Sequence, residues 1–209
     1  MNNKLKIAVI DNYDSFVYNL IRYLKEENET EITVMRNDNI DYSVLDQADG
    51  ILLSPGPGIP DEAGDLKKVI TEYYQKKNML GVCLGHQALA EFFGSKLEKC
   101  VTPIHGESSE INILKTNKIF SNLPSKIQVG RYHSWKVKNI INDKLVFTAF
   151  TQEKEIMALK HKIYPLYGVQ FHPESILTPN GRQIIKNWLN EIQISATKSK
   201  RQKVVENNS

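Results

Sequence analysis

The sharpest chemical feature of the sequence is a cysteine set between two glycines. Residues 81–85 read Gly-Val-Cys-Leu-Gly, after an apolar run and before a segment with helical periodicity. The pattern is typical of a strained strand-to-helix turn that presents a nucleophile, with glycines where side chains would collide with neighbouring backbone. A helix N-terminus favours the thiolate, which is the reactive form of cysteine. Cys83 is therefore a candidate nucleophile, and the Leu84 amide is a candidate donor to an oxyanion.

Two other interpretations of Cys83 stay open on this motif alone. Most cysteines without a disulfide partner are small buried hydrophobes. Cys83 and His86 could also form half of a zinc site, but the sequence offers no second pair with ligand spacing. We therefore expect no metal site.

A thiolate nucleophile needs a group that moves protons, and His172 has the most informative surroundings of the five histidines. It ends the apolar run Tyr-Gly-Val-Gln-Phe and begins His-Pro-Glu. Pro173 disfavours the helical region for the residue before it, so His172 and Glu174 should project to the same side of extended chain. A carboxylate there would fix the imidazole tautomer and stabilise the imidazolium. The alternative is an ordinary surface turn.

A proline- and glycine-rich loop follows another apolar run. It reads Ser-Pro-Gly-Pro-Gly over residues 54–58, without the Gly-Lys-Ser/Thr ending of a phosphate-binding loop. Such a stiff turn can present backbone amides to a substrate, including a second oxyanion donor. A plain strand-to-helix connection is the alternative.

The elements that must position these residues alternate along the first 95 residues. Apolar runs predict strands over 4–10, 31–35, 50–53 and 79–82, and amphipathic stripes predict helices over 16–24, 63–74 and 84–93. This alternation predicts an α/β fold with a mostly parallel sheet, whose ligands bind at the carboxyl ends of its strands.

The second half has a different pattern, rich in short strands. Strands are expected over 111–115, 127–130, 145–150 and 156–160, and one helix over 181–193. We assign one domain to residues 1–194, and expect the polar, basic tail 195–209 to be disordered.

The charge pattern argues against a nucleic-acid partner. The chain of 209 residues has a net charge of +3, and residues 195–209 alone carry four basic and one acidic side chain. The remainder is neutral, unlike a surface that binds phosphates. Two cysteines do not make a disulfide scaffold, and no run approaches the ~18 apolar residues of a membrane span. We expect no membrane association and a cytoplasmic protein.

Taken together, these motifs resemble class I glutamine amidotransferases over about residues 5–192. The matching segments are PGPG at 55–58, GVCLGHQ at 81–87 and HPES at 172–175. DNYDSF at 11–16 and GRYHSW at 130–135 are similar to the glutaminase subunits (component II) of anthranilate synthase and aminodeoxychorismate synthase.

The resemblance implies a flavodoxin-like three-layer sandwich and a role for each motif. Cys83 would be the nucleophile, His172 the general base and acid, and Glu174 the carboxylate that orients it. The amides of Gly58 and Leu84 would form the oxyanion hole. The residues implied to hold glutamine are Gly56, Pro57, Gln87, Ser134 and Trp135.

The resemblance also implies a partner. Glutamine would be hydrolysed through a glutamyl thioester, and the ammonia passed to a chorismate-binding synthase subunit. This chain would need no cofactor, whereas the partner would be expected to use Mg²⁺. The PGPG loop and the following GIPDEAG favour the anthranilate branch. The alternatives are aminodeoxychorismate synthesis, a stand-alone cysteine hydrolase and a non-catalytic scaffold subunit.

Two positions depart from the pattern of the family. Glu107 follows His105-Gly106 where the family often has lysine, and Trp135 stands where leucine is common. Neither belongs to the implied triad, and both are expected near the partner or the rim of the site.

Overall fold

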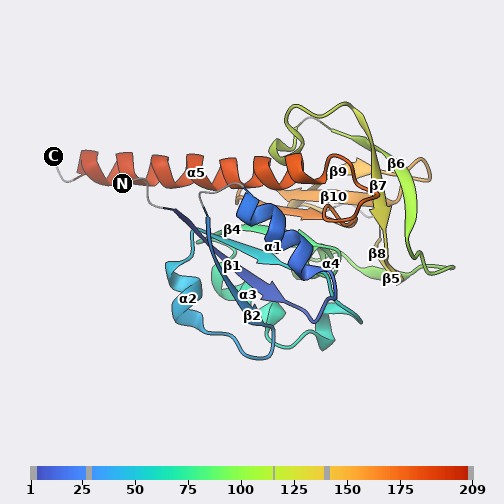
Figure 1. The fold of residues 1–209 in the computed structure, drawn as a ribbon, viewed down its shortest axis with the longest axis horizontal. Helices are drawn as coiled ribbons and strands as arrows, with labels where there is room; N and C mark the ends of the chain where they lie inside the picture. Colours follow the sequence, from blue (N-terminus) through green and yellow to red (C-terminus); the bar gives the residue numbers. More distant parts are fainter. Residues whose placement is uncertain (1–3, 27–29, 115, 139–141, 207–209) are drawn as a thin grey trace.

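A nine-stranded sheet organises the chain (Figure 1), with strands in the order β2-β1-β3-β4-β11-β10-β9-β6-β7. The computed structural model describes residues 4–26, 30–114, 116–138 and 142–206. The five strands from β2 to β11 are parallel, and the pairs from β11 to β7 are antiparallel. The expected α/β fold with a mostly parallel first half is therefore confirmed.

The first half contains every strand and helix that the sequence predicts there. Its elements are β1 (Leu5–Asp11), α1 (Val17–Glu26), β2 (Thr30–Arg36), α2 (Tyr42–Gln47), β3 (Gly50–Leu53), the 3₁₀ turn η1 (Pro60–Glu62), α3 (Leu66–Tyr73), β4 (Asn78–Val82) and α4 (Leu84–Phe92). Besides the short turn η1, only α2 was not expected. It buries a single residue, Leu45, so it leaves no apolar stripe in the sequence.

The second half adds antiparallel strands to the same sheet and a small separate ribbon. Its strands are β5 (Leu97–Lys99), β6 (Glu107–Ile113), β7 (Lys126–Arg131), β8 (Trp135–Val137), β9 (Leu145–Phe150), β10 (Ile156–His161) and β11 (Leu166–Val169), with the 3₁₀ turn η2 (Lys118–Phe120). The ribbon pairs β5 with β8. These three-residue strands are too short to show alternation, so the sequence did not predict them.

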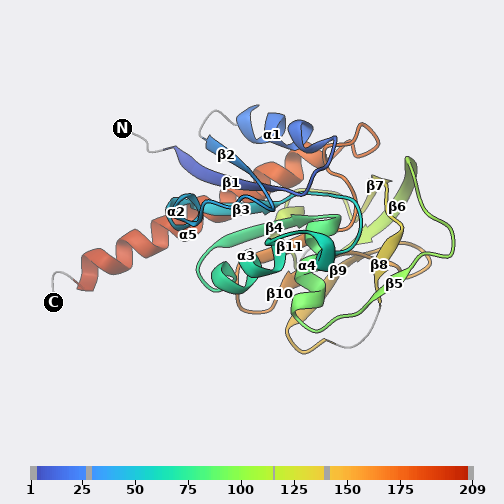
Figure 2. The same ribbon diagram turned by 90° about the horizontal axis from the view of Figure 1, so that it is seen from below.

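Strand β1 shows how the sheet divides the core into two layers. Ile7 and Val9 belong to a cluster with α1 and α5 (Gly181–Glu206), whereas Ala8 and Ile10 belong to a second cluster with α2, α3 and α4. Adjacent residues of a strand point to opposite faces, so an uninterrupted apolar run is what a strand buried on both sides requires. Figure 2 shows α1 and α3 on opposite sides of the sheet, which gives the predicted three layers.

Helix α5 is longer than the sequence predicts. It runs from Gly181 to Glu206 and extends beyond the edge of the sheet (Figure 1), so it includes residues 195–206, for which the sequence predicts a disordered tail. No glycine or proline interrupts this segment. The hydroxyls of Ser195 and Thr197 donate hydrogen bonds to the carbonyls of Glu191 and Gln193, one turn earlier, which accommodates them within the helix. Residues 207–209, the end of the predicted tail, lie outside the described residues.

Within the described part of the chain, no helix combines the length and the apolar character needed to cross a membrane.

Candidate active site

The loops after β1, β3, β4 and β11 meet at one edge of the sheet, and Cys83 lies at the turn from β4 to α4. Its backbone has φ 50° and ψ −100°, a conformation that a residue with a side chain rarely adopts. A Cβ at Gly81 would collide with the carbonyl oxygen of Gly85, and a Cβ at Gly85 would collide with that of Leu53. The two glycines therefore allow the backbone to approach closely enough for the strained turn that the motif predicts.

His172 and Glu174 form the contact that their spacing predicts. His172 Nδ1 lies 2.7 Å from Glu174 Oε1, and both side chains are buried. Burial alone would lower the pKa of His172, but its interactions with Cys83 and Glu174 outweigh this and hold the pKa well above the ordinary value. His172 Nε2 is buried without a hydrogen bond of standard geometry among the described residues. The electrostatics thus favour an imidazolium close to the sulfur.

A hydroxyl group fixes the turn that carries His172. The backbone N–H of His172 donates to the carbonyl of Gly130 at the end of β7 (3.0 Å). Thr178 Oγ1 donates to the carbonyl of His172 (2.7 Å) and accepts from the N–H of Gly130 (2.9 Å). His172 is therefore held by the antiparallel half of the sheet, through a long-range contact that no local motif predicts.

A cavity of about 420 Å³ opens beside Cys83. Of the residues that the sequence analysis assigned to the site, it is lined by Gly56, Pro57, Gly58, Cys83, Gln87, Ser134 and Trp135. Leu84 is buried next to Cys83 and is not among the lining residues. The volume falls within the range of small-molecule sites.

Four lining residues were not among the predicted ones: Lys99, Pro103, Tyr132 and His133. Tyr132 packs against His172 with a ring-centroid distance of 5.0 Å, and its hydroxyl lies 3.1 Å from Ser175 Oγ. Tyr132 and His133 stand inside GRYHSW, so that motif was a sufficient signal for them. Lys99 and Pro103 enter only because the ribbon of β5 and β8 borders the cavity.

The glycine-rich loop is held by the segment that follows β1. The N–H and the side-chain amide of Asn12 donate to Ser54 Oγ and to the Ser54 carbonyl, both at 2.8 Å. A Cβ at Gly56 would lie 2.5 Å from the carbonyl oxygen of Asn12, and Gly58 adopts a φ of +74°. The first motif, DNYDSF, thus supports the loop that lines the cavity.

Gln170 was not among the predicted site residues, yet it contacts the sulfur of Cys83. It is fully buried, and its Nε2 donates to Cys83 Sγ at 3.6 Å. Its position two residues before His172, in the extended run that leads to the histidine, was a signal that could have found it.

A charged cluster forms where Arg131 and His133, both in the segment 131–135, contact Glu155. Glu155 accepts from Arg131 (2.6 Å) and contacts His133 Nε2 (2.8 Å). Burial would raise the pKa of Glu155, but the hydrogen bonds of His133 and Arg131 lower it to about 2. Cys100, His133 and Glu155 also place three potential metal ligands within 4.8 Å of one another. The Arg131 guanidinium already neutralises Glu155 there, which disfavours a second cation.

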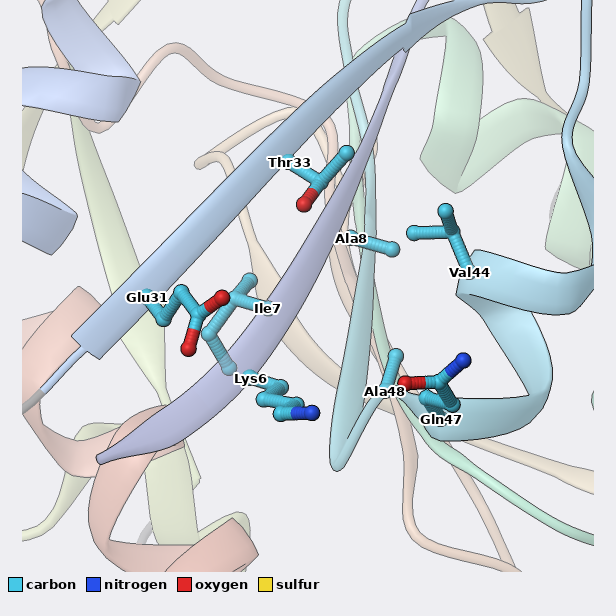
Figure 3. A pocket seen from close by; sticks show the side chains of 8 residues that line it. All are labelled: Lys6, Ile7, Ala8, Glu31, Thr33, Val44, Gln47 and Ala48. Carbon is cyan, nitrogen blue, oxygen red and sulfur yellow. The ribbon is translucent and has the colours of Figure 1, made fainter. Parts of the chain in front are cut away.

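A smaller hollow of about 200 Å³ lies away from this edge of the sheet, between β1, β2 and α2. Figure 3 shows its lining residues, which are Lys6, Ile7, Ala8, Glu31, Thr33, Val44, Gln47 and Ala48. It contains no cysteine or histidine, so it lacks the nucleophile and base that the cavity at Cys83 has.

A buried thiol on a strained turn, a histidine–carboxylate pair and an adjoining cavity define a cysteine-dependent acyl-transfer site. The family described as Glutamine amidotransferase class-I matches residues 8–192. The chain belongs to this family.

Individual relatives agree with this assignment. The chain is 43% identical over 195 residues to the bifunctional protein TrpGD of Thermotoga maritima, covering 90% of this chain but only 33% of that protein. It is 42% identical over 186 residues to the aminodeoxychorismate/anthranilate synthase component 2 of Bacillus subtilis, covering 88% of this chain and 95% of the relative. Further relatives at 40–43% identity are named anthranilate synthase component 2.

A solved structure shares the fold. The crystal structure of a Thermoplasma acidophilum protein, described as one of the subunits of a GMP synthase, superposes with a TM-score of 0.82 at 32% identity. The superposition covers 96% of this chain and 98% of the other.

Proposed function

We propose that this chain is the glutaminase subunit, component II, of an anthranilate synthase. It hydrolyses glutamine and passes the ammonia to a chorismate-binding component I. The observation that carries the glutaminase chemistry is the buried His172–Glu174 pair beside Cys83 on its strained turn. The names of the relatives support the choice of pathway.

The reaction follows from the positions of the three side chains. The Cys83 sulfur attacks the side-chain amide carbon of glutamine, forming a C–S bond and an oxyanion. As the oxyanion collapses, the C–N bond breaks and His172 gives a proton to the departing ammonia. Water, activated by the neutral imidazole, then cleaves the glutamyl thioester, which releases glutamate and restores the thiol. The side chains of this chain supply every step, so the proposal assigns it no cofactor, and Mg²⁺ belongs to the expected partner.

The remaining groups of the cavity bind and polarise glutamine in this proposal. The amides of Gly58 and Leu84 donate to the oxyanion, each contributing on the order of 3 kcal/mol of transition-state stabilisation. Gly56, Pro57, Gln87 and the Ser134-Trp135 segment hold the amino-acid end of glutamine.

The surroundings of the cavity suit a protein partner. Phe16, Val101 and Ile176 are 51%, 103% and 93% exposed. They come from three segments that border the site: Phe16 contacts Tyr132, Val101 lies between two lining residues, and Ile176 follows Ser175. Exposed apolar side chains gathered around a site are typical of docking surfaces. A complex of this kind is a lyase that acts on chorismate, and its thiol chemistry fits the reducing cytoplasm.

Reconstitution tests the proposal. The protein is mixed with a component I of anthranilate synthase, chorismate, Mg²⁺ and glutamine, and anthranilate is followed by its fluorescence. We expect glutamine hydrolysis to be slow for the chain alone and to rise in the complex. In the Cys83→Ala complex, synthesis with ammonium should persist while synthesis with glutamine is lost. Normal use of glutamine by that complex would refute the mechanism.

A second candidate function has specific support, because the Bacillus subtilis relative is named for both aminodeoxychorismate and anthranilate synthesis. The same reconstitution with an aminodeoxychorismate synthase component I decides between one branch and both. A chain that supports neither partner, yet hydrolyses glutamine at full rate alone, would instead be a stand-alone hydrolase.

A further inference from the structure

Two buried amide side chains connect the wall of the cavity to the reacting sulfur. Gln87 Nε2 donates to the carbonyl of Trp135 (2.7 Å) and to Gln170 Oε1 (3.2 Å). Gln170 Nε2 in turn donates to Cys83 Sγ (3.6 Å). Gln87 is 3% exposed and Gln170 is fully buried, so water does not compete for these groups.

The Trp135 carbonyl fixes the direction of all the hydrogen bonds in this series, from Gln87 through Gln170 to Cys83. The Trp135 carbonyl can only accept, so the group of Gln87 that faces it must be the NH₂. The second N–H of that group then points at Gln170, whose side-chain oxygen must accept the hydrogen bond. Turning the Gln170 amide over would set two NH₂ groups against each other and place an oxygen beside the sulfur. The NH₂ of Gln170 is therefore held towards Cys83.

An N–H directed at sulfur matters because the two protonation states of cysteine differ as acceptors. A thiolate is a charged acceptor, whereas a thiol is a weak one. A preorganised donor therefore stabilises the reactive form, and it remains in place while His172 moves protons. The Gln170 backbone is itself fixed, since its N–H donates to the carbonyl of Met157 in β10 (2.9 Å).

We propose that Gln170 is a further catalytic residue, whose amide holds the Cys83 sulfur as a thiolate, and that Gln87 is a positioning residue that orients this amide from the Trp135 carbonyl. The proposal rests on Cys83 being the nucleophile of the proposed glutaminase. It gives Gln87 a task besides holding glutamine, and it links the wall of the binding cavity to the reactivity of the sulfur.

Alkylation of Cys83 tests the proposal without glutamine or a partner. The rate of modification by iodoacetamide is measured from pH 5 to 10 in a Cys100→Ala background, so that mass spectrometry reports Cys83 alone. We expect Gln170→Met to react about tenfold more slowly near neutral pH and to approach the parent rate at high pH, where no donor is needed to form thiolate. Gln170→Glu, which presents an oxygen to the sulfur, should react more slowly still. Gln87→Met should show a smaller loss, about threefold, with Gln170 intact.

Controls separate this effect from a loss of structure. Gln128→Met changes an exposed glutamine of β7 and should leave the whole pH profile unchanged. A merely structural role for Gln170 would loosen the site and give equal or faster alkylation at every pH. Should Gln170→Met fail to fold, Gln170→Glu and Gln87→Met decide the question. Parent-like profiles in the folded variants would overturn the proposal.

The outcome is independent of the pathway. Slowed alkylation in Gln170→Met, together with no glutamine-dependent synthesis by the parent complex, would sustain this inference and refute the proposed function. Normal alkylation in the variants, with an active parent complex, would do the reverse.

Discussion

The two cysteines of this chain are both buried and both free, yet their surroundings differ in every respect that governs reactivity. Cys83 occupies a strained turn before α4, with the Gln170 amide and the His172 pair beside it. Cys100 follows β5, and burial together with the carboxylate of Glu155 raises its pKa. One sulfur faces a donor and a group that favours positive charge, whereas the other faces a negative charge.

This contrast shows that burial alone does not make a thiol unreactive. What matters is the sign of the groups that a buried sulfur meets and whether they are free to act on it. Around Cys100 the two cations that act on the thiol are already engaged, because Arg131 pairs with Glu155 and Lys136 pairs with Glu98. Around Cys83 the ring nitrogen Nε2 of His172 has no other hydrogen-bond partner among the described residues.

The largest expected effect separates the two cysteines directly. Cys83→Ala should lower glutamine-dependent synthesis by the reconstituted complex at least 10⁴-fold, to about the background, because the covalent step is lost. Cys100→Ala should keep activity within about twofold. Glutamine- and ammonium-dependent rates measured side by side check both variants. Equal losses of glutamine-dependent activity in the two variants would show that the two cysteines do not differ in their role.

The second prediction concerns the carboxylate next to His172. Glu174→Gln should reduce kcat/KM for glutamine by about 10³-fold. Burial lowers the pKa of His172 while Cys83 and Glu174 raise it, so removing the charge of Glu174 should lower that pKa. Activity that depends on the imidazolium is lost as pH rises through the pKa of His172. The alkaline limb of the pH profile should therefore move to lower pH in the variant, and an unmoved limb would contradict the assignment.

The third prediction concerns the cluster beside Cys100. The pKa of Glu155 is about 2 in the folded protein, against an ordinary 4.5. A carboxyl group whose pKa is lowered by folding stabilises the folded state at any pH above its ordinary pKa. For Glu155 this contribution is about 3 kcal/mol, and it is lost as the pH falls from about 4.5 towards 2.

Glu155→Gln should therefore lower the free energy of unfolding at pH 7 by about 3 kcal/mol. The difference from the parent should narrow below pH about 4.5 in urea titrations. Glu110→Gln, which removes an exposed pair with Lys126, is the matched control and should cost less than about 1 kcal/mol. Similar costs for both variants would show that the cluster is no more than a surface network.

The smallest effect concerns the backbone of the turn at Cys83. Gly85→Ala places a Cβ against the carbonyl oxygen of Leu53 and should cost about 2 kcal/mol. Gly94→Ala is the control, because the added Cβ lies in open space. Its cost comes only from the backbone strain of a φ of +91°, about 1 kcal/mol. Urea unfolding measures both. If Gly85→Ala costs no more than Gly94→Ala, the turn relaxes easily and its strain does not position the sulfur.

Features written within a few consecutive residues were predicted well. The contact of His172 with Glu174 followed from a proline between them, and the strained turn at Cys83 from its two glycines. In each case sterics act between near neighbours in the chain. The apolar stripes of α1 and α3 were equally visible because each of these helices buries one face, whereas α4 is buried over most of its length.

Features that depend on distant or weakly patterned residues were not predicted. Helix α2 buries only Leu45, and β5 and β8 become strands only by pairing with each other. The tail was expected to be disordered from its composition, yet residues 195–206 continue α5, because a helix already begun on the core adds residues at low cost where no glycine or proline intervenes.

The sequence by itself indicated the candidate nucleophile, the histidine–carboxylate pair, the loop at 55–58 and the alternation of strands and helices, because local sterics and hydrophobic periodicity act within short segments. The tertiary structure alone decided which side chains meet. Gln170 lies 87 positions from the sulfur that it contacts, and Glu155 lies 22 positions from His133. Such contacts arise only when β11 pairs with β4 and the segment 131–135 is brought beside Glu155, and the spacing of these residues along the chain does not record that juxtaposition.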